Sequence, residues 1–115
     1  DTSVPSSAIT SPVSSSTISS LSSVAGTASD TGSGIQKVYV SIQRSYDGAC
    51  DWFAGGVWAT GDCNTPKWVL MTGTTAWSKA ITATSLSGTY TITSVAYDNA
   101  GNIQSTLGTA SVTIP

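Results

Sequence analysis

Few residues of this 115-residue chain have side chains that could take part in acid–base or nucleophilic chemistry. The sequence contains neither His nor Glu, so the usual general bases are absent and six Asp, four Tyr and two Cys remain. Asp47, Asp51 and Asp62 lie in one segment, where a carboxylate pair could form. Short Asp side chains in Gly-rich turns more often bond their own backbone, so the sequence predicts a protein that is not an enzyme.

The two cysteines, Cys50 and Cys63, are close in sequence and are the only thiols of the chain. A zinc site would need two further ligands of suitable type, and the chain has no His to supply them. We therefore expect a disulfide, which would close a short loop and contribute about 3 kcal/mol through chain entropy. A disulfide predicts export to an oxidising compartment, so the chain should be secreted or displayed on a cell surface. The alternative is a pair of reduced thiols.

Several oxygen-bearing side chains lie at turns where the ends of expected strands should converge. Asp1 is in the first segment, Asp30 precedes a glycine-rich turn, and Asp98 and Asn99 lie in the last turn. Hard cations such as Ca²⁺ bind several such oxygens at once. The sequence has no local loop with Asp at alternate positions, so the favoured interpretation is hydrogen bonding within turns. Calcium, the one cofactor considered, is the alternative.

The chain is rich in aromatic residues for its size, and most of the large ones fall between residues 52 and 77. Exposed rings with polar neighbours could stack against a sugar, which would involve Trp52, Trp58 and Trp68 with Asp51, Asn64 and Lys67. Large aromatics more often supply buried area. The favoured interpretation is that Trp52, Phe53 and Trp58 pack beneath a disulfide-closed loop, while Trp68 and Trp77 belong to the core or a sheet face.

Charge and hydropathy limit the partners that the chain could have. The formal net charge is −2, and the four Lys and Arg residues are scattered, so neither nucleic acid nor an anionic membrane is an expected partner. No apolar run approaches the roughly 18 residues of a membrane span, and no signal peptide precedes Asp1, which suggests a mature or excised segment. We expect the isolated chain to be monomeric.

Alternating apolar residues and turn signals every 8 to 12 residues or so predict a chain built of strands. Ser and Thr supply 39 residues, which favours strands and turns over helices. The expected strands are an edge strand around Ile9 that stops at Pro12, then 18–28, 35–45, 67–71, 74–82, 88–98 and about 103–114. A disulfide-containing insertion, 46–66, should hold a small hairpin with Gly55 and Gly56 at its tip. These strands predict one all-β domain over residues 1–115.

The expected strands also have inward and outward faces. Val38, Val40 and Ile42 should point into the core, and Lys37 should lie on the opposite face with Tyr39. Further inward candidates are Trp68, Leu70, Trp77, Ile81, Tyr90, Ile92, Leu107, Val112 and Ile114.

Three segments, 1–12, 24–35 and 86–102, resemble bacterial immunoglobulin-like (Big-type) domains of surface adhesins and secreted multidomain proteins. The resemblance extends over nearly the whole chain except the cysteine-bearing insertion. It implies an immunoglobulin-like Greek-key β-sandwich of about seven to eight antiparallel strands. Tyr90, at the start of a strand after a Gly turn, is where a tyrosine corner would form.

The resemblance also indicates which functions we expect. Such domains serve as spacers, ligand binders and enzyme appendages, so the fold alone does not select among them. We expect a non-catalytic structural or spacer module that presents the adjacent domains of the same polypeptide. In some related repeats, acidic residues at turns hold an ion at the junction between domains. The alternative is a module that binds a carbohydrate, or a host or surface protein, through the aromatic residues from Trp52 to Trp68.

Overall fold

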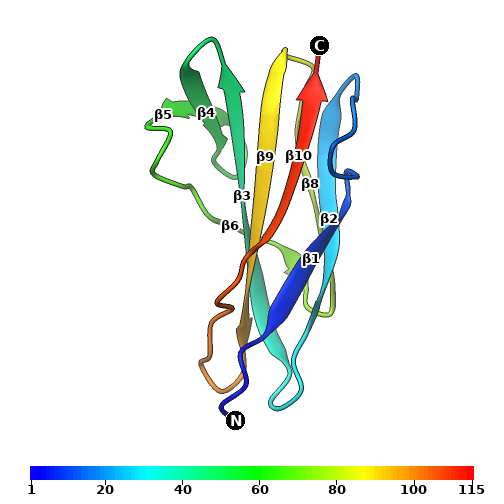
Figure 1. Cartoon of the computed structure of the whole chain (residues 1–115), viewed down its shortest axis with the longest axis vertical. Coiled ribbons are helices and arrows are strands. Elements are labelled where there is room, and N and C mark those ends of the chain that lie inside the picture. Colours follow the sequence, from blue (N-terminus) through cyan, green and yellow to red (C-terminus); the bar gives the residue numbers. More distant parts are fainter.

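Ten β-strands form two sheets in the computed structural model, which describes all 115 residues (Figure 1). The molecule is elongated, with principal extents of 44 × 24 × 23 Å. The strands are β1 (Ser6–Ser11), β2 (Leu21–Ser29), β3 (Ile35–Tyr46), β4 (Ala49–Phe53), β5 (Trp58–Gly61), β6 (Val69–Leu70), β7 (Thr72–Gly73), β8 (Ala76–Thr84), β9 (Gly88–Asp98) and β10 (Gly108–Ile114). No helix in the structure is long and apolar enough to cross a membrane.

The order of the strands is that of an immunoglobulin-like Greek-key sandwich, as predicted. One sheet has the order β1-β2-β8-β7, and the other has the order β10-β9-β3-β4-β5 with β6 also paired to β3. All the strand pairs within these sheets are antiparallel. The count is higher than seven or eight because the insertion adds the hairpin β4–β5, and β6 and β7 are separate two-residue strands.

The N-terminal segment contributes to both sheets. It first pairs with β2 as β1, and residues 15–18 then cross to the other sheet and run parallel to β10. The Ser15 amide donates to the Ser111 carbonyl at 2.6 Å, and the Ile18 amide donates to the Thr113 carbonyl at 2.9 Å. In return, the Thr113 amide donates to the Ser16 carbonyl at 3.1 Å. The strand expected over 18–28 therefore begins later, at Leu21, because Ile18 is already paired to β10.

The core lies between the sheets and follows the predicted alternation of β3 and β9. Val38, Val40 and Ile42 of β3 are at most 1% exposed. The inward face of β9 carries Tyr90, Ile92, Ser94 and Ala96, all fully buried. The remaining core residues come mainly from β2, β8 and β10, and include Val24, Trp77, Ile81, Val112 and Ile114.

Two local contacts stabilise the core and the connection between β8 and β9. The indole of Trp77 lies so close to Gly26 that a Cβ at that glycine would come within 2.2 Å of the ring. Only glycine fits there without displacing the indole. The Tyr90 hydroxyl donates to the Leu86 carbonyl at 2.8 Å, which is the predicted tyrosine corner.

Two more of the expected strands are shorter than the sequence predicts, and three apolar side chains assigned inward are exposed. Within 67–71 only Val69–Leu70 is a strand, and the last strand begins at Gly108 rather than near 103. Trp68 is 41% exposed, and Leu70 and Leu107 are exposed as well. The reason is that residues 62–68 form the connection from β5 to β6, and residues 103–107 form the connection between β9 and β10.

Candidate functional site

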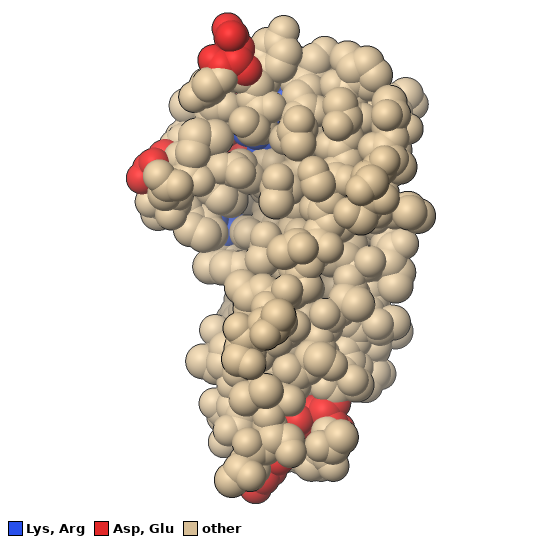
Figure 2. Space-filling view, viewed as in Figure 1, with Lys and Arg blue, Asp and Glu red and all other residues tan.

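Three carboxylates meet at the end of the sandwich where the N-terminus lies. Asp1, Asp30 and Asp98 each offer an oxygen atom, and these atoms all lie within 4.8 Å of one another. Figure 2 shows acidic atoms gathered at this lower tip. Asp30 follows β2 and Asp98 ends β9, so the two sheets bring together residues that are far apart in sequence. We call these three residues the carboxylate cluster.

Asp98 is the fully buried member of the carboxylate cluster. One carboxylate oxygen accepts from the amides of Ala100 (3.0 Å) and Asn102 (2.7 Å), and the other accepts from Asn102 Nδ2 (2.8 Å). Burial alone would raise the pKa of Asp98, but hydrogen bonds from the side chain and amide of Asn102 and from the amides that follow Asp98 outweigh it and lower that pKa. Asp98 is therefore ionised at neutral pH.

The other two members differ in how their oxygens are satisfied. Asp30 Oδ2 accepts from the amides of Gly32 (3.3 Å) and Gly34 (3.1 Å), whereas Asp30 Oδ1 is buried and has no hydrogen-bond partner. The Asp1 carboxylate accepts from the Ser3 amide and from both the amide and the hydroxyl of Ser33 (all 2.9 Å). Asp1 lies directly over Gly32, where a Cβ would come within 2.3 Å of its Cγ.

Asn99, the fourth residue predicted for a metal site, ties the two turns together. Its Nδ2 donates to the carbonyls of Ser33 (2.9 Å) and Gly34 (3.3 Å). No Lys or Arg pairs with the carboxylate cluster, because the structure's single salt bridge joins Arg44 to Asp51. The same residues thus form the hydrogen bonds of the turns and bring their carboxylates close together. The arrangement offers several oxygens and an uncompensated negative charge, which suit a hard cation.

The insertion is closed by the predicted disulfide between Cys50 and Cys63, and it buries one of its tryptophans. Trp52 lies on the same side of β4 as Cys50 and is 5% exposed. Its Nε1 donates to the Asp62 carbonyl at 2.8 Å, and Gln43 Nε2 donates to the Cys63 carbonyl at 2.8 Å. The loop that carries Cys63 therefore covers Trp52.

Phe53 and Trp58, which are opposite one another in the hairpin, pack toward the core. Their ring centroids are 5.6 Å apart, and Trp58 meets Tyr90 edge to face at 5.8 Å. Trp58 Nε1 donates to the Thr82 carbonyl at 3.0 Å. Trp52 and Trp58 thus behave as packing residues. The three tryptophans considered for a sugar surface do not share one face.

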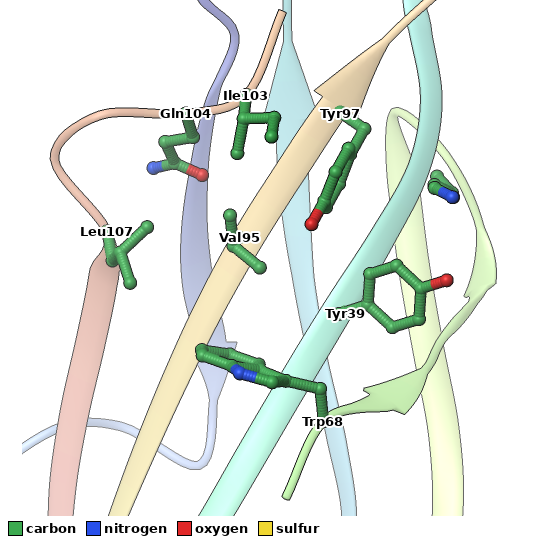
Figure 3. Close-up of a pocket in the computed structure, with 8 residues that line it drawn as sticks. Tyr39, Trp68, Val95, Tyr97, Ile103, Gln104 and Leu107 are labelled. Carbon is green, nitrogen blue, oxygen red and sulfur yellow. The ribbon is translucent and has the colours of Figure 1, made fainter. Parts of the chain in front are cut away.

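Trp68 lies elsewhere, in a hollow on the outer face of β3 and β9. The hollow measures about 420 Å³ and is lined by Lys37, Tyr39, Trp68, Val95, Tyr97 and Gln104, with Ile103 and Leu107 at its rim. In Figure 3, Val95 lies in the middle of these side chains, with Trp68 and Tyr97 on two sides of it. We call this hollow the aromatic groove.

Pairing of β3 with β9 assembles the aromatic groove. Their register sets Lys37 opposite Tyr97 and Tyr39 opposite Val95. Tyr39 and Tyr97 meet edge to face with centroids 5.6 Å apart, and Lys37 Nζ lies 5.3 and 4.9 Å from the two centroids. The sequence points to Trp68 as a candidate ligand-binding residue, but it groups Trp68 with Trp52 and Trp58 rather than with these partners. The outward position of Lys37 and Tyr39 could be predicted, whereas their proximity to Tyr97 and Val95 depends on the register of β3 with β9.

No protein-family model matches this sequence, and no curated protein is detectably similar to it.

Proposed function

We propose that the chain is a non-catalytic spacer module that holds neighbouring domains apart and presents them outside the cell. The observation that carries this proposal is the position of the two chain ends. The N-terminus and the C-terminus lie at opposite ends of the 44 Å long axis (Figure 1). Domains joined before and after such a module would extend in line rather than fold back beside it.

Other features support an extracellular, non-catalytic role. The disulfide is compatible with an oxidising compartment. Two of the three acidic side chains of the insertion have structural partners, since Asp51 pairs with Arg44 at 2.9 Å and Asp62 accepts from the Thr65 hydroxyl at 3.0 Å, whereas Asp47 is exposed at a turn. The resemblance of residues 24–35 and 86–102 to Big-type domains points to a bacterial surface protein or secreted enzyme as the parent.

A protein with two copies joined directly, Pro115 to Asp1, tests the spacer proposal. Small-angle X-ray scattering should give a maximum dimension close to twice the 44 Å long axis of one domain. The isolated domain is the control and fixes the value for a single unit. A two-copy protein hardly longer than one copy would mean that the domains fold back on each other, and it would overturn the proposal.

A second candidate function, calcium binding, is favoured by one observation at the carboxylate cluster. Asp30 Oδ1 is buried without a partner, beside the oxygens of Asp1 and Asp98. An unpaired buried carboxylate oxygen is costly, and a cation would compensate it. Because Asp1 belongs to the first residues of the domain, calcium here would stiffen the junction with a preceding domain.

Thermal unfolding with added cations tests the calcium proposal. Calcium at about 5 mM should raise Tm by a few degrees through binding to the native state, and magnesium should do less because it needs a tighter octahedral site. Asp30→Asn should abolish the shift, whereas the matched variant Asp47→Asn, at an exposed turn, should keep it. The two-copy protein should be measured as well, because a preceding domain could supply further ligands. Absence of a shift in both proteins would leave only the turn-forming role.

A further inference from the structure

The aromatic groove differs from every other aromatic cluster of the domain in its unused hydrogen-bonding groups. Trp52, Trp58 and Trp77 each donate their indole N–H to a backbone carbonyl of the protein. Trp68 Nε1 takes part in none of the protein's hydrogen bonds, and it belongs to a side chain that is 41% exposed. Its polar atom is therefore available to a ligand.

The two tyrosines of the groove and Lys37 also have polar groups that are available to a ligand. The Tyr90 hydroxyl donates to Leu86, whereas the hydroxyls of Tyr39 and Tyr97 have no partner within the protein. Lys37 forms no salt bridge, and its ammonium nitrogen lies over the faces of the two tyrosine rings, 5.3 and 4.9 Å from their centroids. The groove thus presents three apolar ring surfaces, free donors and one uncompensated positive charge.

The shape of the groove is held by residues that do not offer their own polar atoms. Gln104 is 6% exposed, and its Oε1 accepts from the Ser7 hydroxyl (2.6 Å) and from the Ala96 amide (3.0 Å). Its Nε2 donates to the Thr106 carbonyl at 2.7 Å. Gln104 is therefore a positioning residue, because it fixes the segment that carries the rim residues on either side of it.

From this geometry we infer that the aromatic groove binds an acidic saccharide, a chain of sugars that carry carboxylate groups. The C–H face of a pyranose ring stacks on Trp68, and its hydroxyls accept from the free indole and phenol donors. Its carboxylate pairs with Lys37, which has no acidic partner in the domain. The site adds a binding activity to the proposed spacer, and neither proposal depends on the other.

Charge argues against a second copy of the chain as the occupant. The lining of the groove contains Lys37 and no acidic residue. Two grooves facing each other about a two-fold axis would bring two ammonium groups into one interface without a carboxylate between them. A ligand that carries negative charge removes this penalty.

Titration with a four-residue oligogalacturonate, followed by NMR of the indole N–H groups, tests the inference. The four Trp residues give four indole signals, and the acidic sugar should move that of Trp68 with a Kd on the order of 1 mM. The fully methyl-esterified oligomer is the matched probe, because it has the same rings without the charge. It should bind at least about fivefold more weakly.

Substitutions then assign the site. Trp68→Ala should weaken binding by about tenfold or more, as expected when a stacking ring is removed. Lys37→Gln should abolish the preference for the charged oligomer over its ester, whereas Lys79→Gln, on β8 of the other sheet, should change nothing. The indole signals of Trp52, Trp58 and Trp77 report on the fold of each variant and should keep their wild-type positions.

Three results would overturn the inference. The first is no movement of the Trp68 signal up to about 10 mM of the acidic oligomer. The second is equal binding of the acidic and esterified forms, which would remove the role of Lys37. The third is a Trp68 signal that moves with protein concentration alone, which would identify a second copy as the occupant. None of these results bears on the length of the two-copy protein, so the spacer proposal is tested separately.

Discussion

The outer face of β3 has two halves that the chain treats in opposite ways. Toward the C-terminal end of the strand, the disulfide-closed loop covers Gln43 and its neighbour Trp52. Toward the N-terminal end, Lys37 and Tyr39 lie in the open aromatic groove. Each half contains a tryptophan: Trp52 of the insertion lies in the first, and Trp68, which directly precedes β6, lies in the second.

The difference between the halves is in the polar atoms of their aromatic residues. In the covered half, the indole N–H of Trp52 is bonded to the protein and the ring is 5% exposed. In the open half, Trp68 and the two tyrosines keep their donors free. The number of aromatic residues therefore says little about binding. Packing residues differ from residues that can bind a ligand in whether their N–H or O–H group already has a hydrogen-bond partner in the protein.

The largest effect is expected from Trp52→Ala, in the covered half. Removing a buried indole should cost about 3 to 5 kcal/mol of the free energy of unfolding, through lost burial and the cavity left behind. The Asp62 carbonyl also loses its donor. Denaturant unfolding measures the loss, and a cost below about 1 kcal/mol would mean that the two halves are not distinct in packing.

Replacing both cysteines, Cys50→Ala with Cys63→Ala, should have the next largest effect. The disulfide spans 13 positions and should stabilise the domain by about 3 kcal/mol through the entropy of the unfolded chain. Denaturant unfolding of the double variant gives the value. Free-thiol titration of the unfolded, unreduced wild type is the control and should detect no thiol. An unchanged midpoint would mean that the cover over Trp52 does not depend on the crosslink.

The tyrosines allow the comparison to be made one hydroxyl at a time. Tyr90→Phe removes the hydrogen bond to the Leu86 carbonyl and the buried contact with the Thr84 hydroxyl at 3.2 Å, so it should cost about 1 to 2 kcal/mol. Tyr39→Phe, in the groove, removes a hydroxyl with no protein partner and should change stability by less than about 0.5 kcal/mol. Thermal or denaturant unfolding of both variants measures the two losses of stability. Equal losses would contradict the distinction between bonded and free hydroxyl groups.

The smallest effect on stability is expected from Trp68→Ala. Because its ring is 41% exposed and its indole N–H is free, the substitution should shift the free energy of unfolding by no more than about 0.5 kcal/mol. The measurement is the same denaturant titration used for Trp52→Ala. A loss as large as that of Trp52→Ala would show that Trp68 is a structural residue and that the groove is part of the packing.

The sequence predicted those parts of the fold in which one strand carries its own signal. Alternation in 35–45 and in 88–98 located β3 and β9, and the Gly55-Gly56 pair located the β4–β5 hairpin. The predicted position of the tyrosine corner at Tyr90 is also confirmed. Each of these features depends on local periodicity or turn chemistry, which needs no knowledge of a partner strand.

The errors arose where a residue's environment is set by a distant segment. Trp68, Leu70 and Leu107 are apolar but exposed, and hydrophobicity alone cannot tell whether a connecting segment or a two-residue strand turns its side chains toward the core. The carboxylate cluster was foreseeable because Asp30 and Asp98 stand where strands end, and Asp1 belongs to the segment that leads into the first strand. The aromatic groove was not, because it requires the register between β3 and β9.

The double role of the N-terminal segment has a mechanical consequence. Residues 15–18 run parallel to β10, and the chain leaves this pair downward through β1 and upward through the C-terminus of β10. Tension between the two ends would therefore pull the paired strands along each other in opposite directions. The bonds from Ser15, Ile18 and Thr113 would then carry the load together rather than open one after another. In the proposed spacer, this parallel pair would resist in shear a pull directed along the long axis.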